Sequence, residues 1–497
     1  MNGQTTISLA IVVPLIAALL IPLFDKRPNL REAVTLIAAG LLFGLVVSLY
    51  PEVAAGGRPE AVFAEIMPGL SIAFEVEPLG MLFALIASFL WIVTSIYSIG
   101  YMRGHHEQNQ TRFYICFAIA LSSAVGVAFA GNMFTLFVFY EALTISTYPL
   151  VTHAGSDEAR KAGRTYLGIL LGTSIGLQLL AIIGTWVIAG TLDFKPGGIL
   201  AGKASSAVLG ILFVLYIFGV GKAALMPLHR WLPAAMVAPV PVSALLHAVA
   251  VVKAGVFTVV KVIYYVFGLD LLIATPQADW LPYVAGFTII AASVIALQSD
   301  NLKRRLAYST VSQLSYVVFA AAILTPLSVV GAAMHIAAHA FGKITLFFCA
   351  GAIAVAAHKT EVSELDGIGR RMPWTMTAFA VGALSMIGVP PTVGFLSKWY
   401  ILQAALEQQQ VAVMAVIVVS TLLNAAYFLP IVYAAFMRPA DNPGHGAGGA
   451  TGEGAAHGEA PLPVVIALCV TAAGTVLLFF FPDVALNLAR QIVGLGS

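Results

Sequence analysis

Long apolar runs follow one another along almost the whole chain, and they constrain its fold more than any other feature. A transmembrane helix needs about 20 mainly apolar residues in a row. Charged residues make up only 10% of the 497 residues, whereas soluble domains carry about 25%. The sequence therefore predicts an all-α polytopic membrane protein with fourteen transmembrane helices, at about 7–24, 33–50, 79–99, 112–130, 133–151, 164–189, 207–227, 240–266, 281–298, 305–323, 327–357, 374–405, 411–437 and 462–482.

The stretch from Gly221 to Phe257 departs from this simple pattern. It reads GKAALMPLHRWLPAAMVAPVPVSALLHAVAVVKAGVF, in which four prolines separate a run ending in Lys222 from a run carrying His247 and Lys253. An ammonium near the bilayer centre costs roughly 2.5 kcal/mol or more unless it is paired or hydrated. Irregular backbone at that depth is tolerated only where it is buried in protein or lines a watery cavity. We interpret this stretch, with its broken helix seven, as the main functional site.

A faint internal repeat predicts a second broken helix. The segment YEALTISTY at 140–148 resembles YSTVSQLSY at 308–316, five helices later, and the same offset in helix count matches Lys222 to Lys398. Helix twelve has its own break in IGVPPTVGFLSK, just before Lys398. Paired, interrupted segments in two inverted halves point to a transport site. We expect N-terminal helices in 1–110, a first half in 111–267, an inverted second half in 280–437, a flexible Gly/Ala-rich loop in 438–461, and a last helix in 462–497.

The basic residues predict the orientation of the chain. Sixteen of the 25 fall on one side of the fourteen predicted helices, and four, Arg58, Lys195, Lys203 and Arg490, fall on the other. The positive-inside rule then places both termini outside. The remaining five are lysines inside the predicted helices: Lys222, Lys253, Lys261, Lys343 and Lys398. Lys261 is near a helix end, so we expect its side chain to extend to the membrane interface.

Glu141 is the acidic residue that the sequence places in the middle of a helix. A buried carboxylate among buried lysines should find a lysine partner, because pairing removes much of the cost of burial. We expect that partner to be Lys222. The pair is either a structural ion pair or a proton site whose affinity depends on the distance between the two groups.

His335, His339 and Lys343 are spaced by four residues in helix eleven, which places them on one helix face. With His247 and Lys253 they would form a polar row across the membrane interior. The two histidines have two alternative interpretations, as metal or haem ligands or as a packed polar pair. No HExxH glutamate accompanies them, and histidines four residues apart on one helix would reach the same side of a haem.

Lys398 differs from Lys222 in one respect. Ser309 stands where the first half has Glu141, so Lys398 lacks a carboxylate partner in its own half. An unpaired buried ammonium should release its proton more readily. We therefore expect Lys398 to be the outlet of the polar row.

Four motifs together resemble the antiporter-like proton-translocating family shared by respiratory complex I, Mrp-type cation/proton antiporters and membrane-bound hydrogenases. They are VFYEALTISTYPL around Glu141, the run from Gly221 to Gly255, HxxxHxxxK in helix eleven, and GxPPxxGFxSK in helix twelve. The resemblance covers about residues 70–435 and implies two inverted five-helix bundles, helices 4–8 and 9–13. It also implies that Glu141, Lys222, Lys253 and Lys398 transfer protons along hydrated polar residues.

Within that family the sequence is most similar to the D-type member of Mrp antiporters in its Lys253 motif and its length. No long amphipathic helix follows helix fourteen, which disfavours the distal complex I subunit and the large A-type member of Mrp antiporters. We expect a proton channel subunit of an Mrp-like antiporter in the bacterial inner membrane. Its expected partners are other membrane subunits, lipid, protons and sodium, and we expect no cofactor and no metal. The alternative is a proton-pumping subunit of a complex I-like or hydrogenase assembly.

A third interpretation makes this chain itself a quinone- or haem-dependent oxidoreductase. Cys116, Cys349 and Cys469 occur singly in apolar runs without CxxC spacing, which argues against an iron–sulfur or zinc site. Nucleotide-binding glycine-rich turns are also absent from the sequence. A spectrum of the purified chain without haem, flavin or iron–sulfur bands would exclude this interpretation.

Overall fold

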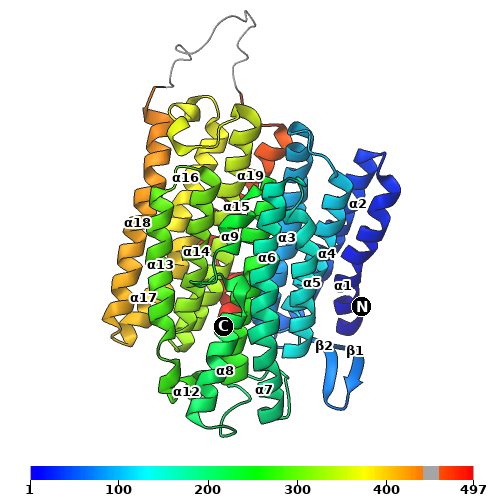
Figure 1. Ribbon diagram of the computed structural model, residues 1–497, viewed down its shortest axis with the longest axis vertical. Helices are drawn as coiled ribbons and strands as arrows, with labels where there is room; N and C mark the ends of the chain where they lie inside the picture. The colour runs from blue at the N-terminus through cyan, green and yellow to red at the C-terminus, as the bar shows by residue number, and fades with distance from the viewer. Residues whose placement is uncertain (1, 440–457, 496–497) are drawn as a thin grey trace, which may run out of the picture.

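The computed structural model describes residues 2–439 and 458–495 as a bundle of helices that run mostly along the long axis of the molecule (Figure 1). The N-terminal part consists of α1 (Gly3–Leu20), α2 (Pro28–Ala54), β1 (Glu60–Met67), β2 (Leu70–Glu75), α3 (Pro78–Gly104), α4 (Gln110–Ala128), α5 (Met133–Val151), α6 (Asp157–Thr173) and α7 (Leu179–Ala189). The π-helical turn η2 (Ser174–Gln178) joins α6 to α7.

The middle of the chain is the most irregular part. It consists of α8 (Ser206–Gly219), the 3-10 turn η3 (Gly221–Ala223), α9 (Trp231–Ala234), η4 (Ala235–Val237), α10 (Val240–Ala244), the π-turn η5 (Leu245–Val249), α11 (Val251–Lys261), the π-turn η6 (Val262–Phe267) and α12 (Leu269–Ile273). The remaining helices are α13 (Leu281–Gln298), α14 (Leu302–Ala321), α15 (Pro326–Ala357), α16 (Pro373–Ile387), α17 (Val393–Glu407), α18 (Val411–Met437), α19 (Leu462–Phe480) and α20 (Asp483–Ile492).

The fourteen expected segments all contain helix in the structure. Among the described residues, eleven helices are long and apolar enough to cross a membrane. The three other expected spans coincide with α8, α14 and the α16–α17 pair, which are shorter or more polar. The chain is therefore an all-α polytopic membrane protein. Of the loop expected at 438–461, residues 440–457 lie outside the described part of the chain.

Both predicted breaks are present. α8 ends at Gly219, earlier than the expected end at 227, and no regular helix resumes before Trp231. α16 ends at Ile387 and α17 begins at Val393. Gly388 follows α16 with φ +90°, and a Cβ there would lie only 2.7 Å from Cδ of Lys398. A residue with a side chain would be strained at this turn, so Gly388 lets the second break close tightly against its lysine.

Two elements were not expected from the sequence. The strands β1 and β2 form an antiparallel hairpin in which Glu60 pairs with Glu75 and Met67 with Leu70. After the last apolar helix, the short helix α20 packs back on the bundle, and Gln491 donates a hydrogen bond to the carbonyl of Ala54 at the end of α2 (2.7 Å). Neither element contains an apolar run long enough to cross a membrane, and membrane-length apolar runs were the signal used to predict helices.

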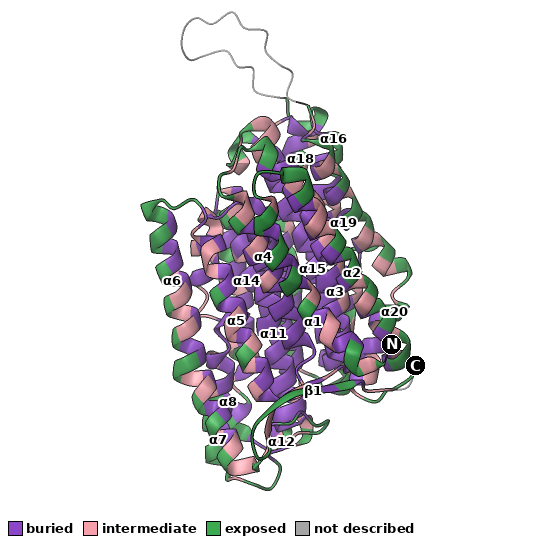
Figure 2. Ribbon diagram, turned by 90° about the vertical axis from the view of Figure 1, so that its right-hand side faces the viewer, coloured by how far each residue is buried: buried purple, intermediate pink, exposed green. Residues whose placement is uncertain are grey.

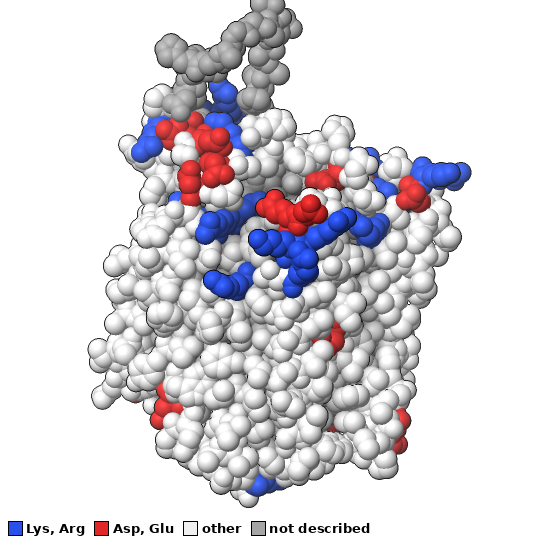
Figure 3. Space-filling view, viewed as in Figure 1, with Lys and Arg blue, Asp and Glu red and all other residues white. Residues whose placement is uncertain are grey.

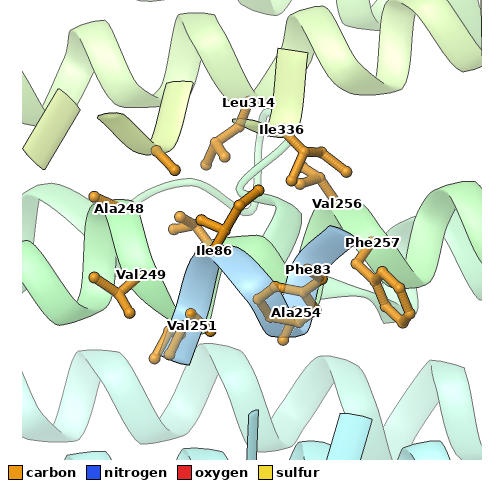
Figure 4. Close-up of a cluster of buried hydrophobic side chains, with 14 of the residues drawn as sticks. Phe83, Ile86, Ala248, Val249, Val251, Ala254, Val256, Phe257, Leu314 and Ile336 are labelled. Carbon is orange, nitrogen blue, oxygen red and sulfur yellow. The ribbon is translucent and has the colours of Figure 1, made fainter. Parts of the chain in front are cut away.

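Burial is highest along the centre of the bundle, in α11, α14, α15 and α3 (Figure 2). α6 and α7, at one edge of the same view, are mostly exposed or half-buried. A dense apolar cluster lies at the centre, where Phe83 and Ile86 of α3 meet residues of η5 and α11 together with Leu314 and Ile336 (Figure 4). Polar side chains that lie among these helices are therefore removed from both water and lipid.

The exposed charges gather towards one end of the molecule. Figure 3 shows basic and acidic residues together in the upper part of this face, above a broad band that contains few charges. The described chain begins and finishes towards the opposite end (Figure 1). A belt with few charges is the surface expected of a protein surrounded by lipid.

Candidate functional site

Lys222 is held at the first break, directly after α8. It is fully buried, and its Nζ donates to the carbonyl of Tyr140 (2.8 Å) and to Oγ1 of Thr144 (2.6 Å). The same ammonium lies 3.1 Å from the centroid of the Tyr140 ring, a cation–π contact. One backbone group of the break also has a side-chain partner, since Trp231 Nε1 donates to the carbonyl of Gly221 (3.0 Å). The break therefore presents Lys222 to α5.

Glu141 does not pair with Lys222 in this structure. Its two carboxylate oxygens are buried without a hydrogen-bond partner, and it takes part in no ion pair among the described residues. Lys222 is bound instead to the backbone carbonyl of Tyr140 and to the hydroxyl of Thr144, one helical turn after Glu141. Glu141 instead lies on the same face of α5 as the exposed residues Val138 and Ile145. The expectation of a direct Lys222–Glu141 contact is therefore not met.

Lys253, on α11, contacts a histidine of α15. Its Nζ lies 2.6 Å from Nδ1 of His339, and both side chains are fully buried. A Cβ on Gly255 would lie 2.3 Å from the backbone of Lys222, so α11 approaches the first break closely at this point. His247, in η5, packs its ring on Phe347 (4.9 Å between centroids), and both of its ring nitrogens lack a partner in the described residues.

His335, His339 and Lys343, which the sequence placed in its eleventh predicted span, all lie buried on α15. His335 contacts Oγ of Ser397 (2.9 Å) through Nδ1 and Oε1 of Gln313 (3.1 Å) through Nε2. Lys343 donates from Nζ to Oγ of Ser309 (2.7 Å), the residue that the repeat matches to Glu141. Both ring nitrogens of His335 are therefore occupied by protein groups. Among the described residues there is also no group of three or more His, Cys, Asp or Glu that could hold a metal ion.

Lys398 lies at the second break. Its Nζ donates to the carbonyls of Met386 (3.0 Å) and Ile387 (2.9 Å), the last two residues of α16, and lies 4.8 Å from the ring of Tyr316. Carbonyls at a helix C-terminus have no intrahelical partner and carry partial negative charge, so they attract a cation. Among the described residues Lys398 thus forms no ion pair with a carboxylate, and it is stabilised instead by the end of α16.

The sequence interpretation of Lys261 was wrong. Its Nζ lies 3.0 Å from Oε1 of Glu77, and the two side chains are only 1% and 4% exposed. Glu77 also accepts from the amides of Leu79 and Gly80 at the start of α3 and from the hydroxyl of Tyr265 (2.8 Å). The turn η6 continues the helix for six residues beyond Lys261, and this extension keeps the ammonium away from the interface.

Several polar residues of the site were missed from the sequence. Gln313, Ser397, Asn424 and Tyr427 are all completely buried and bond to one another, to the predicted residues or to the second break. Each lies within an apolar helix, and Gln313 follows Ser309 by one helical turn. An isolated amide or hydroxyl at such spacing in an apolar run is the signal that could have identified them, because polar groups within the bilayer are costly and rare.

Together these features define a class of protein: a polytopic helical membrane protein with several buried, titratable side chains and two broken helices. Residues 130–424 match the family described as "NADH:quinone oxidoreductase/Mrp antiporter, TM", and residues 68–114 match "NADH-Ubiquinone oxidoreductase (complex I), chain 5 N-terminus". The chain belongs to this antiporter-like family.

Relatives of the chain occur in more than one kind of assembly. NADH-quinone oxidoreductase subunit N of Desulforudis audaxviator is 31% identical over 96% of this chain and 95% of its own length. A probable component (A/B) of a K(+)/H(+) antiporter of Rhizobium meliloti is 31% identical over 82% of this chain, but the match covers only 40% of that longer protein. A chain of the Mrp complex from Dietzia sp. DQ12-45-1b has the same fold, with a TM-score of 0.87 at 21% identity over 99% of this chain and 97% of that one.

Proposed function

We propose that this chain is a proton-translocating subunit of a multisubunit, Mrp-like monovalent cation/proton antiporter. The observation that carries the proposal is the row of buried titratable groups from Glu141 through Lys222, Lys253 and His339 to Lys343 and Lys398. Ionisable residues inside a membrane are costly, and they commonly mark proton relays. Lysine suits such a relay because it can exist in both protonation states when buried, whereas arginine stays charged.

In the proposed mechanism, protons pass between neighbouring members of the row. Lys253 and His339 are already in hydrogen-bond contact (2.6 Å). Several buried polar atoms have no partner in the described residues. They are both carboxylate oxygens of Glu141, both ring nitrogens of His247, and Nε2 of His339. Buried polar groups are normally satisfied by protein or by ordered water, so we expect water to connect these groups to the rest of the row.

The two proposed halves, 111–267 and 280–437, each contain one broken helix with a lysine beside it. Lys222 donates to the carbonyl of Tyr140 in α5, whereas Lys398 donates to the carbonyls of Met386 and Ile387 at the end of α16. In the proposed scheme the two breaks admit water from opposite sides of the membrane, and Lys398 is the outlet.

We further propose that the chain lies in a bacterial inner membrane with both termini outside. Charges are concentrated towards one end (Figure 3), and the marked ends of the chain lie towards the other (Figure 1), as this orientation would require. The proposed partners are other membrane subunits. Val138 and Ile145, which are 38% and 62% exposed on the Glu141 face of α5, offer an apolar surface that a neighbouring subunit would cover. The row would then continue from Glu141 into that subunit.

A redox-driven complex is the second candidate, and the full-length similarity to a subunit N of NADH-quinone oxidoreductase favours it. The two candidates differ in what drives proton movement. Reading the neighbouring genes for small Mrp-type subunits or for redox subunits separates them first. Vesicles containing the intact complex then test the proposal: added sodium or potassium should move protons without any electron donor. Proton movement that requires a donor and ignores the cations would refute the antiporter assignment.

A further inference from the structure

We infer that Asn424 and Tyr427 of α18 are positioning residues that couple the hydrogen bonding of Lys398 to the charge of Lys343. The two lysines do not touch. A chain of buried contacts joins them, and it passes through these two side chains. The inference rests on the proposed proton translocation and adds residues that the sequence motifs do not include.

The contacts form a continuous path. Lys343 Nζ donates to Oγ of Ser309 (2.7 Å), and that hydroxyl lies 3.0 Å from the hydroxyl of Tyr427. Tyr427 donates to Oδ1 of Asn424, whose Nδ2 donates to the carbonyl of Met386 (3.5 Å).

The same carbonyl of Met386 accepts from Nζ of Lys398 at 3.0 Å. Ser309, Asn424 and Tyr427 are all completely buried, and Asn424 and Tyr427 lie three residues apart on one face of α18. These contacts are therefore shielded from the solvent outside the protein.

The direction of these hydrogen bonds depends on Lys343. A protonated lysine has three donors and no acceptor, so Ser309 must accept from it and turn its own proton to Tyr427. Tyr427 then donates to Asn424. If Lys343 is neutral, its lone pair can accept from Ser309, and Ser309 can accept from Tyr427. Asn424 then loses its donor, and its amide is free to turn towards the end of α16.

The path is not a proton wire along its whole length. Hydroxyls can accept and donate a proton, but the amide of Asn424 and the carbonyl of Met386 only hold hydrogen bonds. What reaches Lys398 is therefore a change in hydrogen bonding. Loss or gain of a proton at Lys343 alters the hydrogen bonding of the carbonyls that stabilise the ammonium of Lys398. The protonation of Lys398 therefore depends on the charge of Lys343.

Two variants test the coupling in the intact complex in vesicles. Tyr427→Phe removes one hydroxyl and should lower the rate of proton translocation at least tenfold. Asn424→Asp keeps the shape but adds a carboxylate near Lys398, which favours the protonated lysine. The alkaline limb of its rate-against-pH profile should move up by about one pH unit, which tests whether the side chain at position 424 lies within electrostatic reach of Lys398 and whether the protonation of Lys398 limits the rate.

Tyr216→Phe is the matched control, since it also removes a buried hydroxyl contact, to Thr185 (2.8 Å), away from the row. It should translocate protons at the wild-type rate. Near wild-type rates and an unchanged pH profile in both Tyr427→Phe and Asn424→Asp would overturn the inference. If Lys222→Ala stops translocation in the same assay, the proposed function stands while the inference falls. A wild-type complex that moves no protons would refute both.

Discussion

The ammonium of Lys222 lies 2.6 Å from the hydroxyl of Thr144, one helical turn from Glu141 on α5. The lysine expected to pair with the glutamate is therefore bound to the same helix by other groups. A movement of the Lys222 side chain along α5 would exchange the Thr144 contact for the carboxylate. We interpret the structure as the open form of a switchable pair. In this form Glu141 can bind a proton or contact a neighbouring subunit.

The Thr144 contact can be tested on its own. Thr144→Val keeps the size and shape of the side chain but removes the acceptor for Lys222. Hydrogen bonds to charged groups contribute about 1.5–3 kcal/mol. The variant should therefore destabilise the state in which Lys222 lies at position 144, relative to the state in which Lys222 pairs with Glu141. The translocation rate should then fall about tenfold or more. Thr185→Val, outside the row, should translocate at the wild-type rate, and equal rates in the two variants would contradict the role of Thr144.

Proton translocation should require that Lys398 releases its proton, and a permanently charged side chain cannot do so. Lys398→Arg keeps the positive charge but does not deprotonate at working pH. It should stall translocation as completely as Lys398→Ala, measured in the intact complex. Near-normal activity of the arginine variant would instead mean that Lys398 supplies only a fixed positive field.

The Glu77–Lys261 pair should stabilise the fold. Removing one partner of a buried ion pair leaves an uncompensated charge and costs about 3–5 kcal/mol. Lys261→Met should therefore lower the thermal unfolding temperature and the abundance of the protein, since the Glu77 carboxylate loses its counter-charge. Adding Glu77→Gln to Lys261→Met should recover part of the loss. Normal thermal stability of Lys261→Met would show that the pair contributes little.

The isolated chain should show no cation-dependent proton movement. The proposed row begins at Glu141, beside an exposed apolar strip on α5, and it needs polar groups of a neighbouring subunit to continue. Vesicles containing only this polypeptide are therefore expected to be inactive, whereas vesicles with the whole complex are active. Robust antiport by the pure chain would contradict the multisubunit assignment.

The sequence predicted the helices and their two breaks because both depend on local signals. Apolar runs of membrane length identify the spans, and Pro390, Pro391 and the four prolines between Lys222 and His247 identify the breaks. The hairpin β1–β2 was missed because its segments are short and polar at their ends.

The partners of the buried lysines were harder to predict, because they depend on packing between distant segments. Lys222 binds residues 78 and 82 positions away, and Lys253 binds a histidine 86 positions away. Lys261 was misassigned for the same reason, since its partner Glu77 lies before α3 and comes close only in the folded bundle. The sequence could identify the buried lysines and histidines, but not most of the hydroxyls and amides that contact them.

The central claim is that protons cross the membrane along this buried row, and the most direct measurement is cation-driven proton movement in vesicles containing the intact complex. Wild type should be compared with Glu141→Gln and Lys222→Ala at equal amounts of assembled complex. The account predicts that both variants reach the membrane at near-normal abundance and lose proton movement almost entirely. Wild-type rates in both, or losses explained fully by missing protein, would contradict it.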